Sequence, residues 1–238
     1  MQTESLPLTV STRSSRTING GPALRDLVSL LDSTGTSILN VAAYYIDQTT
    51  TVADFRPVFE TAATLQAKFV CVSGYDQNED RFSEKLAELA ESAKHFGLSL
   101  ALEFVPYSQC RTLVAANNAI TKSGTANVQI LLDMLHFMRS GSSIQDLKST
   151  PPERFGFFQI CDGPSFQPPP DALAEEARNT RLLPGEGAFP LKEVLEALPC
   201  AIQIEIETPN AAIRHLPYEE QALVMTRSVT SYLNALSI

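Results

Sequence analysis

Short apolar runs alternate with longer amphipathic segments along most of the chain. The runs have the length of strands, and they are almost continuously apolar, which is typical of strands covered on both faces. They lie at Thr36–Ile46, Lys68–Tyr75, Leu98–Phe104, Val128–Leu132, Phe155–Cys161 and Ala201–Glu207.

The segments between these runs place apolar residues three and four positions apart, which predicts helices. They lie at Leu24–Ser33, Val52–Gln66, Asp80–Phe96, Ser108–Ser123, Leu191–Leu198 and Tyr218–Leu236. Gly97 follows the third of them, where a helix end favours a residue with positive φ. Strand and helix alternating at this spacing indicate βαβ units and a parallel sheet.

The pattern predicts an α/β protein, a parallel (β/α) barrel of the TIM type. A chain of 238 residues can form such a barrel undivided, and no shift in composition marks a boundary, so we expect one domain over residues 1–238. The one long irregular stretch is Asp162–Gly187, with four prolines between Pro164 and Pro170. A loop this long in a compact domain is usually functional, and we interpret it as an active-site loop.

Acidic and amide residues interrupt the apolar strands near their ends. Glu103, Asp133, Gln159 and Glu205 occupy such positions on four successive strands. A charged, unpaired carboxylate in an apolar strand costs several kcal/mol. If the strands close into a barrel, these side chains meet at its C-terminal rim. A hard divalent cation then suits them, although satisfied core polar residues or ion pairs at the rim are the alternative.

With these residues in hand, the chain resembles the sugar phosphate isomerase/epimerase superfamily, the xylose-isomerase-like barrels. The resemblance covers roughly the C-terminal two thirds, and the order, spacing and residue types agree together. The matching pieces are LALEF around Glu103, LLDMLH at 131–136, FFQICD at 157–162, RLLPGEG at 181–187 and IQIEIE at 202–207.

The resemblance implies a role for each matching residue. It makes Glu103, Asp133, Gln159 and Glu205 the metal ligands, with Glu103 and Glu205 also forming an acid/base pair. It makes His136 an active-site histidine, although a hydrogen bond to Asp133 is an equal alternative. It places Arg181 where a substrate oxygen is gripped. We expect further substrate contacts from Glu207, Tyr107 and Tyr45, and we expect Asp162 to orient Arg181.

Two features depart from the usual pattern of the family. The third ligand is most often histidine, and the amide of Gln159 favours Mg²⁺ or Mn²⁺, with Co²⁺ or Zn²⁺ remaining open. This glutamine resembles the branch that contains 3-dehydroshikimate dehydratases. Only about 35 residues precede the first clear strand, with PLTVST at 7–12 as the sole earlier strand candidate. The barrel is therefore expected to be irregular or shortened at its N-terminus.

Three functions follow from this set of residues. A metal that chelates a carbonyl and an adjacent hydroxyl acidifies the proton between them, so that an enediolate forms. Returning the proton gives an isomerase or epimerase of a sugar or sugar phosphate, which is the function we predict. Loss of a β-hydroxyl gives a dehydratase instead, and a barrel that only binds its ligand is the third reading. The expected partner is a sugar, cyclitol or keto acid.

Composition narrows the setting of this chemistry. The net charge of −9, without a dense basic stretch, argues against nucleic acid and anionic membranes as partners. No apolar run approaches the roughly 20 residues of a membrane span, and no signal peptide is visible. We expect a cytoplasmic protein. A shortened barrel would expose apolar surface, which leaves a homo-oligomer open.

Overall fold

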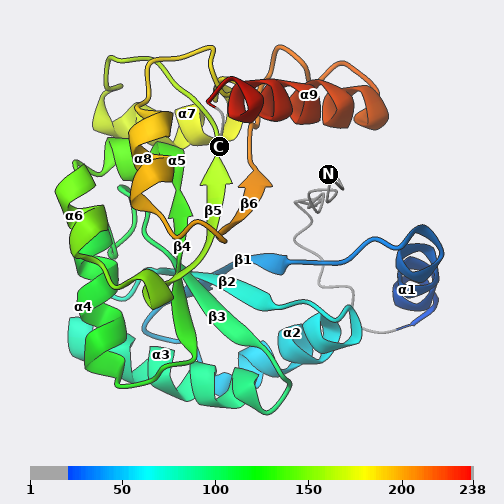
Figure 1. Ribbon diagram of the computed structural model, residues 1–238. Helices are drawn as coiled ribbons and strands as arrows, with labels where there is room; N and C mark the ends of the chain where they lie inside the picture. The colour runs from blue at the N-terminus through cyan, green and yellow to red at the C-terminus, as the bar shows by residue number, and fades with distance from the viewer. Residues whose placement is uncertain (1–20, 237–238) are drawn as a thin grey trace. The chain divides into compact units, whose positions relative to one another are not determined.

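The computed structural model describes residues 21–236 and contains the alternation that the sequence predicts (Figure 1). Six strands follow one another in one sheet in sequence order, so the predicted strands are confirmed. The strands are β1 (Asn40–Ile46), β2 (Phe69–Gly74), β3 (Ser99–Glu103), β4 (Val128–Asp133), β5 (Phe155–Ile160) and β6 (Gln203–Ile206). The candidate strand at 7–12 lies outside the described residues.

The described chain divides into two compact units. One comprises residues up to Glu103 together with Ala116–Ile130, and the other Phe104–Ala115 together with the chain from Leu131 onward. The single domain expected over residues 1–238 stays a prediction. The helices are α1 (Pro22–Thr34), α2 (Val52–Thr64), α3 (Glu79–Lys94), α4 (Leu113–Ser123), α5 (Met134–Arg139), α6 (Ile144–Ser149), α7 (Leu173–Asn179), α8 (Leu191–Ala197) and α9 (Tyr218–Leu236). Two short 3₁₀ helices lie at Pro152–Arg154 and Pro170–Ala172.

The first unit is a parallel β-α arrangement with β2 at its centre. Every residue of β2 is buried, as the apolar run predicts, and β2 pairs in parallel with both β1 and β3. In β1, by contrast, four residues from Ala42 to Tyr45 are at least partly exposed, so burial on both faces was a wrong expectation for this strand. Helices α2 and α3 pack on the strands, and Gly97 adopts the predicted positive φ of 74°.

The second unit contains three short helices that the sequence pattern did not indicate. Asp133 ends β4 and caps the N-terminus of α5, whose residues are nearly all buried, so no amphipathic period is visible there. Ser143 and Asp146 form a capping box that starts α6. The stretch predicted as one irregular loop, Asp162–Gly187, contains α7, because the prolines end before the helix-favouring sequence LAEEARN.

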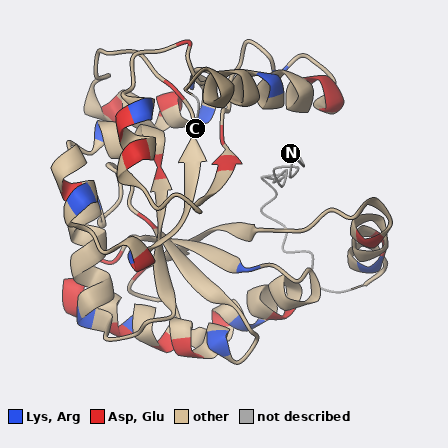
Figure 2. Ribbon diagram, viewed as in Figure 1, with Lys and Arg blue, Asp and Glu red and all other residues tan. Residues whose placement is uncertain are grey.

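Charged residues in each unit gather on the helices, and the strands are largely apolar (Figure 2). The exceptions are the polar residues at strand ends that the sequence singled out. Within residues 21–236, no helix combines the length and the apolarity that a membrane span requires.

Candidate active site

Parallel pairing of β5 and β6 brings two of the predicted site residues together. Gln159 on β5 lies directly opposite Glu205 on β6. The Gln159 amide donates to Glu205 Oε2 at 3.2 Å. Both residues are buried, and Gln159 Oε1 has no hydrogen-bond partner. A buried amide oxygen left unpaired costs free energy unless another group completes the site.

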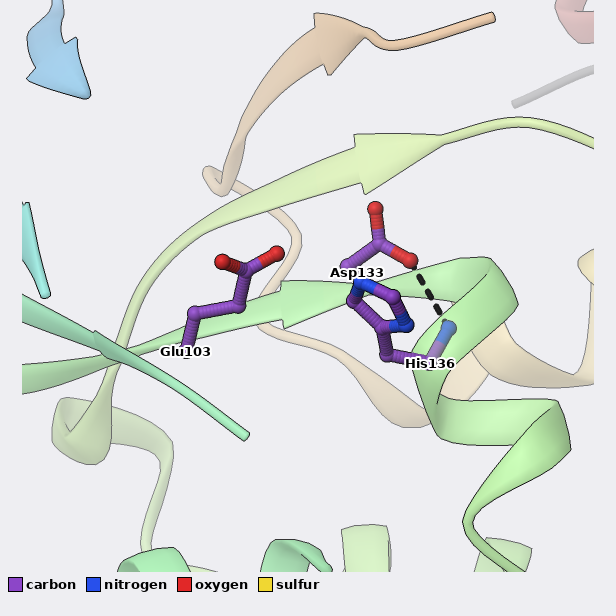
Figure 3. Close-up of side chains that lie close together, drawn as sticks. All are labelled: Glu103, Asp133 and His136. Atoms are coloured by element: carbon purple, nitrogen blue, oxygen red, sulfur yellow. Dashed lines mark hydrogen bonds between the residues drawn. The ribbon is translucent and has the colours of Figure 1, made fainter. Parts of the chain in front are cut away.

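Asp133 is fully buried at the end of β4 and accepts hydrogen bonds at both carboxylate oxygens. Oδ1 accepts from the backbone N–H of His136 at 2.8 Å, the bond marked in Figure 3. Oδ2 accepts from Arg181 Nη1 at 2.5 Å. Burial alone would raise the pKa of Asp133, but the Arg181 charge, followed by His136 and these hydrogen bonds, lowers it to about 2. The carboxylate is therefore ionised at neutral pH.

Arg181 contacts several groups of this unit, and only 2% of its side chain is exposed. Nε donates to the Ala177 carbonyl at 2.9 Å, Nη1 also reaches Cys161 Sγ at 3.5 Å, and Nη2 lies 3.4 Å from Glu207 Oε2. Burial opposes its charge, but the carboxylates of Asp133 and Glu207 hold the pKa of Arg181 well above its ordinary value. The guanidinium thus binds protein groups on several sides.

Glu207 follows β6 and shares the Arg181 guanidinium with Asp133. Its side chain is 19% exposed. Burial raises the pKa of Glu207 to about 7, Asp133 and Glu205 push it in the same direction, and Arg181 opposes them. A carboxyl group that titrates near neutrality can both take up and release a proton under ordinary conditions.

His136 occupies the first turn of α5 and is almost completely buried. Burial lowers the pKa of His136 to about 4 despite the nearby Asp133 carboxylate, so the imidazole is neutral at neutral pH. The Tyr107 ring meets it edge-on, with the ring centroids 5.7 Å apart. Ligand atoms of Asp133 and His136 lie within 4.8 Å of each other, which is compatible with a shared cation. The hydrogen bond to Asp133 expected for His136 is present as a bond from its backbone N–H.

The other two predicted site residues belong to the first unit. Glu103 ends β3, and its carboxylate accepts a hydrogen bond from Ser73 Oγ at 3.2 Å, a contact that the sequence did not indicate. Tyr45 lies near the end of β1, where the residue is 57% exposed, and its ring meets the Tyr75 ring edge-on with the centroids 4.8 Å apart.

Three further residues of the second unit make contacts that the sequence did not indicate. The Asp162 carboxylate accepts hydrogen bonds from backbone N–H groups, so the orientation of Arg181 by Asp162 stays a prediction. Arg139 and Glu176 form a buried bidentate ion pair, with N–O distances of 2.9 and 2.6 Å. Arg139 and Glu176 lie 37 residues apart, so periodicity could not have found their ion pair.

Comparison with known proteins identifies the class to which this arrangement belongs. The chain is a member of the xylose isomerase-like TIM barrel family, whose model matches residues 12–227. The resemblance inferred from the sequence motifs is therefore confirmed. Family membership also accounts for the sequential strand order with polar residues at the strand ends.

Individual relatives extend this finding. An inosose isomerase from Bacillus velezensis is 31% identical over 157 residues, which cover 62% of this chain and 54% of the relative. The matched region thus spans about half the length of the curated relatives. The IOLI protein, solved with a bound zinc atom, superposes with a TM-score of 0.78 at 22% identity over 90% of this chain and 83% of that one.

A second solved structure is the probable 3-DHS dehydratase AsbF from Bacillus anthracis. Its TM-score is 0.69 at 14% identity, over 87% of this chain and 81% of that one. At these identities the two structural likenesses establish the shared fold.

Proposed function

We propose that the protein is a divalent-metal-dependent isomerase or epimerase that acts on a cyclitol or a related hydroxy-ketone. Glu103, Asp133, Gln159 and Glu205 would hold the metal. The observation that carries the proposal is the unpartnered, buried Oε1 atom of Gln159 beside the Glu205 carboxylate. The 31% identity to an inosose isomerase supports the choice of substrate class.

The oxygen-rich donor set fits a hard divalent cation. Asp133 and Glu205 supply carboxylates and Gln159 an amide oxygen, which are the ligands that Mg²⁺ and Mn²⁺ prefer. Asp133 and Glu207 already share one guanidinium, so a cation beside them would reduce the repulsion between carboxylates. The zinc atom in the IOLI protein supports a metal at such a site. Expecting Glu103 in the same site rests on the family motif.

A bound divalent cation would polarise a substrate carbonyl and so acidify the proton on the neighbouring carbon. The residues of this chain would then move that proton. Glu205 would remove or return it, and Glu103 would act as its counterpart. Glu207, with a pKa near 7, would exchange a proton with a substrate hydroxyl. Neutral His136, packed against Tyr107, would orient that hydroxyl.

The proposal is tested by incubating the protein with an inosose in D₂O and following loss of the α-proton by NMR. Exchange is expected with Mg²⁺ or Mn²⁺ and is expected to stop with a chelator. Glu205→Gln should lower the exchange rate at least about 100-fold, because a positioned base contributes that much or more. The matched control is Glu196→Gln, on the exposed surface of α8, which should leave the rate unchanged.

The same samples are incubated with 3-dehydroshikimate, because the glutamine at the third ligand position resembles the dehydratase branch. Elimination of water without α-proton exchange on inososes would make the protein a lyase. Exchange that persists in Glu205→Gln would refute the assigned site. A protein that binds the cation but turns over none of these compounds would be a ligand-binding barrel.

A further inference from the structure

The carboxylate of Asp162 lies at the centre of a turn made of backbone N–H groups. Oδ1 accepts from Gly163 at 2.8 Å and from Phe189 at 3.0 Å. Oδ2 accepts from Gly185 and Gly187, each at 3.0 Å. All four partners are donors, so this position requires two acceptor oxygens. A carboxylate meets that requirement, whereas an amide of the same shape would turn an NH₂ group towards two N–H groups.

The glycines of this turn are needed for the carboxylate to be approached so closely. A Cβ atom on Gly187 would lie 2.3 Å from Asp162 Oδ1 and 2.4 Å from the Gly163 carbonyl oxygen. A Cβ atom on Gly163 would lie 2.4 Å from the Phe189 ring. Gly185 has a φ of 91°, which other residues rarely adopt. The glycines of the PGEG sequence at residues 184–187 therefore allow the turn to pack closely around Asp162.

The same residue also holds the backbone next to Arg181. Asp162 N donates to the Leu182 carbonyl at 2.8 Å, and Leu182 N donates to the Asp162 carbonyl at 2.9 Å. On the other side of Arg181, its own N–H donates to the Pro209 carbonyl at 3.2 Å. The backbone that carries Arg181 is thus fixed directly after the residue by Asp162, through main chain and side chain together.

We propose that Asp162 is a positioning residue, which holds the 182–189 turn so that the Arg181 guanidinium stays on Asp133 and Glu207. The inference adds to the proposed function a residue that does not reach the guanidinium itself. The physical basis of this proposal is the length of the Arg181 side chain. Arg181 reaches its carboxylates with a long side chain, so displacement of its backbone would lengthen the 2.5 Å bond to Asp133.

The test follows the Arg181 Nε–H group by ¹⁵N NMR, because this proton exchanges slowly while it is bonded to the Ala177 carbonyl. Its signal is assigned by its loss in Arg181→Lys. In Asp162→Asn its hydrogen exchange should become at least roughly ten-fold faster, as expected when a hydrogen bond to a charged group is lost. The matched control is Asp146→Asn, which removes a carboxylate that also accepts a backbone N–H in this unit. It should leave the Arg181 signal unchanged.

A second measurement uses the unmodified protein, so it holds even where Asp162→Asn fails to fold. In low urea, the Arg181 Nε–H and the amides of Gly185 and Gly187 should open with the same denaturant dependence, as one unit. Faster exchange of the glycine amides in Asp162→Asn with unchanged Arg181 exchange would overturn the proposal. So would independent opening in the unmodified protein. Neither measurement uses substrate or metal, so failure here is distinct from failure of the proposed function.

Discussion

Two arginine–carboxylate clusters, one in each unit, show how differently the same chemistry is used. In the first unit, Arg81 and Asp76 form a bidentate pair five residues apart, with both N–O distances 2.6 Å. In the second unit, Arg181 joins Asp133, 48 residues away, and also lies 3.4 Å from Glu207. The first pair is local and balanced one to one, whereas the second shares one cation between two carboxylates.

The surroundings of the two arginines differ as much as their partners. The Arg81 side chain is 42% exposed, so water can still solvate it, and its partner Asp76 also accepts the Asn78 N–H. The Arg181 side chain is 2% exposed, and the same unit contains Gln159 Oε1, a buried amide oxygen without a partner. A pair that closes on itself is typical of structural stabilisation. Two carboxylates that share one buried arginine, in a unit that also contains an unpaired buried oxygen, are typical of a binding site.

Removing each arginine is the strongest test of this contrast. Arg181→Met should lower the free energy of unfolding by about 3–5 kcal/mol, because it leaves buried Asp133 without its cation. Arg81→Met should cost less, since the pair is local, Arg81 is 42% exposed, and Asp76, although buried, keeps its hydrogen bond from the Asn78 N–H. Urea unfolding at neutral pH measures both changes. Equal losses would show that the two clusters serve the same structural purpose.

The fold was largely predictable from the sequence, because the spacing of apolar residues indicates which side of each strand or helix is buried. All six strands were found, and β2 shows the complete burial that its apolar run indicates. The expectation failed where burial does not follow that pattern. The short helices α5 and α7 are too brief, or too evenly buried, to show a helical period, and β1 is partly exposed although its sequence is apolar.

A substitution of Gln159 has the next largest expected effect, and it tests whether the second unit contains a metal site. Gln159→His would replace an amide oxygen with imidazole, a ligand better suited to zinc. Affinity for Zn²⁺ relative to Mg²⁺ should rise by roughly an order of magnitude, measured by competition between the two ions. The control is Gln145→His, at an exposed position on α6, which should leave the preference unchanged. An unaltered preference in Gln159→His would remove Gln159 from the ligand set.

The residues of the candidate site were predictable from the sequence, but their hydrogen-bond and ion-pair partners were not. Carboxylates in apolar strands stand out in any sequence, because their burial needs a partner. The identity of that partner depends on which loops return to the strand ends. Arg181 was expected to grip a substrate oxygen, and the sequence did not indicate the bonds that it makes to Asp133, Ala177 and Cys161. Asp162 was expected to orient Arg181, and the structure shows its carboxylate bound to the turn that follows Arg181.

The smallest effect belongs to the balanced pair, and its pH dependence separates it from the other cluster. Hydrogen bonds from Arg81 lower the pKa of Asp76 below its ordinary value of 3.8, although burial opposes them. Its contribution to stability is therefore present above 3.8 and is lost as the pH falls through the lowered pKa. Asp76→Asn should cost about 1 kcal/mol at neutral pH, because the bidentate pair is lost while Arg81 remains partly solvated. In strong acid, where Asp76 is protonated in both states, the two proteins should unfold at nearly the same urea concentration. A difference that stays constant with pH would mean that Asp76 acts through packing, and the contrast between the clusters would then rest on Arg181 alone.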